Sequence, residues 1–563
     1  SCTIRVMEGR RSTTVEEIEA VVREIQREED AGEITENAMF QVPSVVLKDE
    51  ALPPPGRVTE ERSFPSVGFE VLTLSNGMKV GMKTTDFLDD QVLVRCFAKG
   101  GLSEVPESEY LDALYANTIA TELGIFGLKP EILSDVLAGK RCDVSSKTGT
   151  YYRRVDGDTS PTDIESGLQL IHALFTSNVR DMLVPEELEA VLRMQEQAIR
   201  NRSRNPNTLF HETIRYLAYG RSYMTRPLKP SDVRKMRPLR ACEHFNASYS
   251  DPSEFAVALV GAFDADRVRP MLEKYLGSIP VPSDSKPHDS KPLTPATFKF
   301  PSGVVNKTIR VPMVEPMAMA SIIFPINIPN PDHDAVTGEV VATVEGSAKI
   351  RRMKHISVTA SGIIERRLLA LLRFKFGEIY TCSAGASFSY QDQSAMVGDV
   401  IRGDVMISFS CDPDAGQRLA ALALENVVDL IENGPTLEDV KTAVEVERRT
   451  LEVSAKENSY WREYFQALTN SRLAPVVDGD LDAIFELSER TREELLDGIT
   501  PAIVREHLRE CLKVQDRVVV VLRPRRALWR RVLTPDPTTA EGLVVMSCVG
   551  IAAWGVMRCF KRR

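Results

Sequence analysis

The sequence lacks the residue pairs from which proteins most often build a catalytic metal site. Its seven histidines are never closer than 22 residues apart and lie at positions 172, 211, 244, 288, 333, 355 and 507. A zinc site on a helix needs two imidazoles one turn apart on the same face, and no such pair exists here. The nine cysteines form no C-x-x-C pattern. Cys242 and His244 are the nearest mixed pair, but alternate residues of a helix cannot converge on one ion.

The sequence also has no signal-peptide pattern and no concentration of positive charge. It begins with Ser1-Cys2-Thr3, so we expect this start to be a truncation or processing point. Scattered cysteines are typical of reduced, buried thiols in a compartment outside the secretory pathway. The formal net charge of −10 argues against a nucleic-acid partner, because phosphate binding needs a concentrated basic face. We therefore expect an intracellular globular protein without a nucleic-acid partner.

The most informative pattern that is present covers residues 68–101. Apolar and polar side chains alternate on both sides of Asn76-Gly77. Because Asn and Gly accept the positive φ of a tight turn, this alternation predicts a β-hairpin. A third strand over residues 92–97 runs into Gly100-Gly101, and a helix is expected over residues 110–124. That helix contains no histidine.

Two long segments repeat one order of elements: a strand, two helices that begin near prolines, and a late strand. The first copy has helices at 162–175 and 185–204 and a late strand at 255–261, and the second has helices at 414–431 and 437–456 and a late strand at 517–523. The shared order predicts a duplicated α+β fold, with antiparallel-rich sheets packed by helices. Chance similarity of two α+β domains is the alternative. Between the copies, residues 281–296 are rich in Pro, Ser and Lys and form the expected linker.

The N-terminal segment predicts one helix followed by a linker. Residues 13–30 carry apolar side chains at helical spacing, and Thr14 and Glu17 match a capping box. Residues 41–62 then contain clustered prolines among charges, which is typical of a linker. We expect the helix to close a preceding half of a longer protein.

The C-terminal tail predicts a membrane anchor. Residues 542–557 form a run of 16 without charge, which as a helix spans about 24 Å against roughly 30 Å of hydrocarbon core. Residues up to 560 extend the span if Arg558 snorkels, and Trp554 fits an interfacial anchor. We expect a transmembrane helix over residues 542–560. A terminal helix buried against a domain, or a tail that is disordered in the soluble form, is the alternative.

The sequence resembles a known family of zinc peptidases. The runs SNGMKV and GG at residues 75–101, and RGDVMISFSCDP at residues 402–413, are similar to those of the pitrilysin/insulinase family, and in particular its plant and algal PqqL-like proteases. The resemblance implies four homologous domains in two halves that close around unfolded peptide. The family's zinc motif, His-x-x-Glu-His, lies in the first domain, so Zn is implied for the full-length protein and none for this chain.

The resemblance also implies a domain division. Residues 1–67 would be a helix and linker from the preceding half, and residues 525–563 a basic segment and the tail. Between them would lie a third domain at 68–280, the linker at 281–296 and a fourth domain at 297–524. The implied partners are a peptide substrate, the missing N-terminal half and, through the tail, a membrane. A plastid or mitochondrial location is expected.

One element of the family's chemistry is implied for this chain. Members carry an arginine near the end of a helix and a tyrosine seven residues later in a strand, and both donate hydrogen bonds to the substrate carbonyl. Arg373 and Tyr380 have that spacing. The alternative is a solvated arginine at a helix end and a tyrosine packed at a sheet edge. The basic residues 341–362 interrupt the expected helix before Arg373, as a surface loop or as an error in the gene sequence.

Two functions of different class follow. In the first, this chain is the C-terminal half of a zinc metalloendopeptidase and supplies a chamber wall and transition-state donors. In the second, it is a catalytically inactive, peptidase-like structural module.

Overall fold

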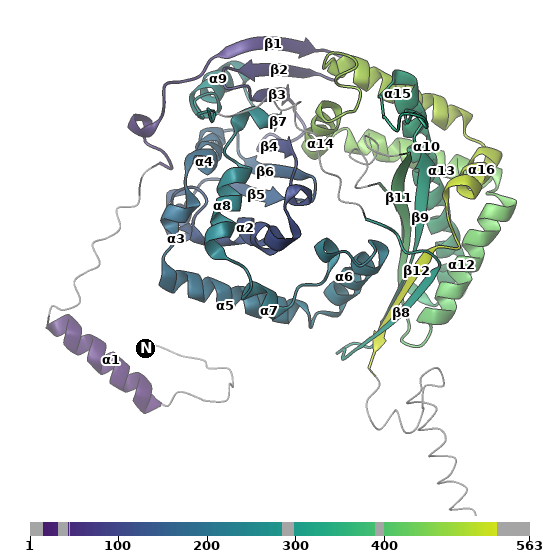
Figure 1. Cartoon of the computed structure of the whole chain (residues 1–563), viewed down its shortest axis with the longest axis horizontal. Coiled ribbons are helices and arrows are strands. Elements are labelled where there is room, and N and C mark those ends of the chain that lie inside the picture. The colour runs from purple at the N-terminus through teal and green to yellow at the C-terminus, as the bar shows by residue number, and fades with distance from the viewer. Residues whose placement is uncertain are drawn as a thin grey trace, which may run out of the picture.

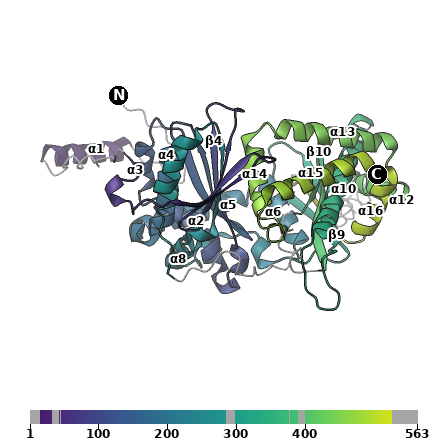
Figure 2. The same cartoon turned by 90° about the horizontal axis from the view of Figure 1, so that it is seen from above.

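A computed structural model describes residues 15–31, 43, 45–283, 298–375, 377–388 and 399–525 of the chain. Two α+β repeats lie side by side, and α1 (Val15–Asp30) stands apart from both (Figures 1 and 2). The mixed α+β architecture with two helix-packed sheets confirms the predicted fold class.

The first repeat is built on a seven-stranded sheet. Its strands, in the spatial order β1-β2-β3-β7-β4-β6-β5, are β1 (Val58–Phe64), β2 (Phe69–Leu74), β3 (Lys79–Thr84), β4 (Val92–Lys99), β5 (Cys142–Thr148), β6 (Tyr152–Thr159) and β7 (Ala256–Gly261). The predicted hairpin is confirmed, since β2 and β3 pair antiparallel around a turn in which Gly77 has φ 85°. The Asn76 amide donates to the carbonyls of Leu276 and Ile279, at 2.7 and 3.2 Å, which ties this turn to the end of the repeat.

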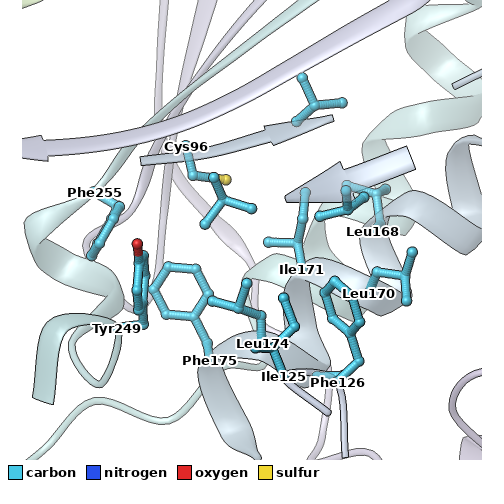
Figure 3. Close-up of a cluster of buried hydrophobic side chains, with 14 of the residues drawn as sticks. Cys96, Ile125, Phe126, Leu168, Leu170, Ile171, Leu174, Phe175, Tyr249 and Phe255 are labelled. Carbon is cyan, nitrogen blue, oxygen red and sulfur yellow. The ribbon is translucent and has the colours of Figure 1, made fainter. Parts of the chain in front are cut away.

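The first repeat also contains α-helices, several of which cover one face of its sheet. They are α2 (Tyr110–Leu123), α3 (Pro130–Val136), α4 (Ile164–Thr176), α5 (Pro185–Arg202), α6 (Pro206–Ala218), α7 (Pro230–Val233), α8 (Pro238–Ser248) and α9 (Ala265–Met271). In the core beneath the sheet, Phe175 packs its ring edge-on against Phe255, with centroids 4.9 Å apart, and beside Tyr249 (Figure 3). Such apolar burial is the main stabilising contribution to the repeat.

The second repeat has five strands in the order β10-β11-β9-β12-β8. They are β8 (Val304–Val311), β9 (Ala318–Pro329), β10 (Ile379–Ser387), β11 (Val400–Cys411) and β12 (Arg517–Pro524). The order matches β5-β6-β4-β7-β3 of the first sheet strand for strand, and the parallel pair β12–β8 matches β7–β3. The two repeats therefore share one topology, as the order of elements in the sequence predicts.

The second repeat contains further α-helices. They are α10 (Val344–Leu368), α12 (Gly416–Asn433), α13 (Leu437–Ser454), α14 (Asn458–Thr469), α15 (Leu481–Gly498) and α16 (Pro501–Cys511). All of them except α14 pack on one face of that repeat's own sheet. One π-helical segment, Leu369–Lys375, continues α10. Their buried side chains meet the inward faces of β9 and β11 in one apolar core.

Each repeat packs one of its helices on the sheet of the other repeat. Helix α14 packs on the first sheet, where Phe465 lies 4.8 Å from Phe69 between ring centroids. In return, α6 packs Phe210 and Ile214 against the second sheet, on the face opposite its own helices (Figure 1). Because the exchange is reciprocal, the two repeats share two apolar cores and form one interlocked unit.

The expected interruption at residues 341–362 is wrong. Residues 344–368 form one continuous helix, α10, capped by the Thr343 hydroxyl, which accepts from the Gly346 amide at 2.9 Å. Ile356, Ala360 and Ile363 recur at helical spacing and are buried. The basic side chains that suggested a loop lie on the less buried face of this helix, and a solvated basic face is compatible with a helix.

Several expectations fall on residues that the structure does not describe. These are the cap at Thr14, most of the linker at 281–296, and the tail at 526–563 with its apolar run. Among the described helices, none is both long and apolar enough to cross a bilayer. The domain boundaries, the membrane tail and the organelle stay predictions.

Candidate functional site

Arg373 lies where the longest helix ends. The π-helical segment Leu369–Lys375 widens the final turn, and within it Leu372 is fully buried while the next residue, Arg373, is exposed. The chain then stops being helical at Gly377, which has φ 69° and donates its amide to the Arg373 carbonyl at 2.9 Å. Glycine accepts this left-handed conformation without strain. Wide turns of this kind often occur at functional sites.

Tyr380 occupies a β-bulge at the start of the edge strand β10. Ile379 pairs with Cys411 and Thr381 pairs with Ser410, so Tyr380 is the extra residue between two adjacent partners on β11. A bulge turns a side chain away from its regular alternation. Tyr380 and Thr381 are accordingly both exposed, and the relative exposure of Tyr380 is 58%.

Two polar contacts hold the segment between Arg373 and Tyr380 against the start of α12. The Tyr380 hydroxyl donates to Asp412 Oδ1 at 2.9 Å. Glu378 pairs with Arg418, which lies in the first turn of α12. The hydrogen bond to the Asp412 carboxylate raises the pKa of Tyr380, because the carboxylate favours the protonated phenol.

The arrangement suits hydrogen-bond donation to another molecule. A guanidinium carries five N–H donors, and a phenol remains protonated near neutral pH. The structure brings Arg373 and Tyr380 to one helix-to-strand connection, and both side chains are exposed. Within the described ranges, no hydrogen bond or ion pair involves the Arg373 guanidinium. The predicted seven-residue spacing therefore joins two exposed side chains that carry hydrogen-bond donors.

The position at which a zinc helix would follow Gly100-Gly101 holds α2, and its residues do not fit a metal. Asp112, the acidic residue of its first turn, is 2% exposed and accepts from the backbone N and the guanidinium of Arg237 at 2.5–2.8 Å. Nowhere in the described chain do three His, Cys, Asp or Glu side chains converge as metal ligands would. The described residues therefore provide no zinc site.

Cys242 and His244, and the acidic Glu212 of α6, lie in contacts within the protein and not around a metal site. Cys242 is buried in α8, while His244 lies 3.1 Å from Glu109 Oε2. Glu212 of α6 pairs with Arg202 at 2.7 Å. These contacts join neighbouring helices within the first repeat.

Sequence reasoning missed Asp412 and Glu378. Asp412 directly follows β11 and precedes Pro413, a pattern that marks a strand end. Its contact with Tyr380, 32 residues away, follows from the pairing of β10 with β11, which only the topology of the sheet reveals.

Comparison with known proteins identifies relatives over the whole chain. Residues 242–446 match the family described as the peptidase M16 inactive domain. A zinc protease PQQL-like of Arabidopsis thaliana is 33% identical over 563 residues, covering 99% of this chain and 54% of the relative. The chain thus spans about half the length of this curated relative.

Solved structures show the same fold. The periplasmic protease PqqL from Escherichia coli superposes with a TM-score of 0.61 at 18% identity, covering 91% of this chain and 51% of that chain. The peptidase M16 inactive domain from Pseudomonas fluorescens superposes with a TM-score of 0.58 at 16% identity, over 82% of this chain and 98% of that one.

Proposed function

This chain belongs to the M16, pitrilysin-like family of zinc peptidases, as a homologue of PqqL-like zinc proteases, and from that premise we propose that it is the half that does not bind zinc. One observation carries the proposal: the chain matches the family's inactive domain, while its described residues hold no metal-binding group. In this proposal the complete protein is a metalloendopeptidase that degrades short or unfolded peptides in a closed chamber. This chain supplies part of the chamber wall.

We assign Arg373 and Tyr380 the role of hydrogen-bond donors to the substrate carbonyl. Both side chains are exposed on connections shaped by a π-helical turn and a β-bulge, features that are common next to functional sites. Fixed donors stabilise negative charge that develops on a carbonyl oxygen, and removing one costs about 10²- to 10³-fold in rate. Zinc would be held by residues outside the described part of this chain.

The test uses the protein completed by its N-terminal half. Arg373→Ala and Tyr380→Phe should each lower kcat/KM by about 10²-fold or more with bound zinc unchanged. The double variant should lose less than the product of the single losses, because both donors serve one oxygen. Tyr152→Phe, which alters a tyrosine packed against Arg154 in the first repeat, is the matched control and should keep normal turnover.

The alternative is a catalytically inactive structural module. It predicts a lower melting temperature for Arg373→Ala, with unchanged specific activity in the fraction that stays folded. Turnover close to wild type in both single variants would remove the donor role and leave this chain only a wall of the chamber.

A further inference from the structure

Asp412 is held on a rigid part of the second repeat. Cys411, the residue before it, is fully buried and pairs with both Ile379 of β10 and Ala318 of β9. Pro413 follows and fixes its own φ, and the Asp412 carbonyl accepts from the Ala415 amide at 3.1 Å. The backbone around Asp412 is therefore determined on both sides, and its exposed side chain lies at the end of the sheet, where it contacts Tyr380.

The Asp412 carboxylate accepts the one hydrogen bond that the Tyr380 hydroxyl can donate. A phenol has a single O–H, and at 2.9 Å that O–H is directed at Asp412 Oδ1. In this conformation Tyr380 presents oxygen lone pairs, and not its proton, to the solvent in front of β10. A substrate carbonyl must take the proton away from Asp412 before Tyr380 can bind it.

We propose that Asp412 is a positioning residue. It keeps the Tyr380 hydroxyl from donating to the bound substrate, so that this hydroxyl donates only to the transition state. The inference rests on the proposed donor role of Tyr380 and extends it. The hydrogen bond to Asp412 holds the phenol at the bulge, while Glu378 and Arg418 hold the preceding backbone against the same helix, α12. No covalent bond changes in this step, since the phenolic hydrogen only exchanges one acceptor for another.

The competition favours the transition state for an electrostatic reason. An ionised acceptor forms a hydrogen bond roughly twice as strong as a neutral one does. A neutral substrate carbonyl is the weaker acceptor and leaves the proton with Asp412. An oxygen that carries developing negative charge takes the proton at a net gain, because Asp412 is exposed and water replaces the phenol at its carboxylate. Tyr380 then contributes to the transition state and little to the bound substrate, which is the difference that accelerates a reaction.

The first test uses this chain alone and needs no activity. Tyrosine ring carbons are labelled, the Tyr380 signal is assigned with Tyr380→Phe, and its titration is followed by NMR. Asp412→Asn should lower the pKa of Tyr380, because an amide oxygen favours the protonated phenol less than a carboxylate does. Asp404→Asn makes the same change beside Tyr219, at the other end of β11, and should leave the Tyr380 titration unchanged.

The second test measures kcat and KM in the protein completed by its N-terminal half. Asp412→Asn should lower KM by about two- to tenfold, the value of one neutral hydrogen bond gained by bound substrate. Because transition-state binding changes little, kcat should fall in parallel and kcat/KM should stay within about threefold. A merely structural role would leave KM unchanged and lower only the amount of active protein.

The outcomes separate this inference from the function on which it rests. Normal turnover in Tyr380→Phe overturns the donor role itself, and the inference with it. Slow turnover in Tyr380→Phe together with an unchanged KM in Asp412→Asn overturns the inference alone. An unchanged Tyr380 titration in Asp412→Asn also overturns it, whatever the kinetics show.

Discussion

His507 makes the stability of the second repeat sensitive to acid. It lies in α16 with 5% of its surface exposed, and its Nε2 is 2.8 Å from the Ser357 hydroxyl of α10. Burial disfavours the imidazolium and lowers the pKa of His507 from 6.5 to about 4. The unfolded chain therefore binds a proton more readily than the folded one. Stability is fully present above about pH 6.5 and is lost as the pH falls toward 4, by up to about 3 kcal/mol.

Urea unfolding at pH 7.5 and at pH 5 measures this loss. His507→Gln should unfold with a smaller difference between the two pH values than the wild type, because glutamine does not titrate. His211→Gln alters an exposed histidine on α6 and should retain the wild-type difference. Equal pH dependence in wild type and His507→Gln would contradict the assignment.

Asp404 gives stability a pH dependence opposite to the one that His507 gives. This carboxyl on β11 accepts from the Tyr219 hydroxyl at 3.3 Å, and burial raises its pKa from 3.8 to about 6. The folded state disfavours the ionised form, so the contribution to stability is present below about pH 3.8 and is lost as the pH rises through 6. Asp404→Asn should increase the free energy of unfolding at pH 7.5 by about 1–2 kcal/mol. The gain should shrink toward pH 4 in the same urea titrations, whereas a constant gain would point to packing.

The sequence predicted the residues of the candidate site better than their surroundings. The spacing of Arg373 and Tyr380 could be read directly, because both belong to one short connection. The bulge at Tyr380 and its hydrogen bond to Asp412 could not, since both depend on how β10 registers against β11. The register joins residues of two separate strands, so the local sequence around Tyr380 does not specify it.

At the scale of elements, the exchanged helix α14 should contribute to the stability of the first repeat. Phe465 is 1% exposed and contacts Phe69 and Phe97 with its ring. Gly81 on β3 leaves room for it, because a Cβ there would lie 2.2 Å from the Phe465 ring. Phe465→Ala removes an aromatic side chain from a closed core and should cost about 3–5 kcal/mol.

Denaturation followed by tryptophan fluorescence measures the cost, since Trp461 lies on the same helix. Val446→Ala truncates an exposed side chain of α13 and should change stability by less than about 0.5 kcal/mol. A cost below about 1 kcal/mol for Phe465→Ala would mean that α14 is not an integral part of the first repeat.

Local signals predicted most elements, and the exceptions have a physical cause. The hairpin around Asn76-Gly77 and the helices that begin near prolines carry strong turn and cap chemistry. Residues 341–362 mislead because several positive charges suggest a loop, whereas the apolar residues at helical spacing decide the structure. Which face of a sheet α6 or α14 covers depends on contacts between residues far apart in the chain, and no local pattern encodes them.

At the scale of the molecule, the interlocked repeats should form a folded unit that cannot by itself perform the family's reaction. The sheets of the two repeats have seven and five strands in the described chain, each repeat covers part of the other, and the described residues hold no metal-binding group. The purified chain, dialysed against zinc, should therefore bind no stoichiometric metal and cleave no unfolded peptide. Metal analysis by mass spectrometry and a fluorogenic peptide assay are the measurements.

The same sample must be shown to be folded, because an unfolded chain would also be inactive. A single cooperative melting transition, unchanged by the addition of zinc, supplies that control, since a ligand that binds the native state raises its melting temperature. One tightly bound zinc per chain would place ligands outside the described residues and would contradict the division of labour between halves. Peptide cleavage that survives a chelator would show instead that this half carries a metal-independent activity, which none of the contacts of Arg373 or Tyr380 provides.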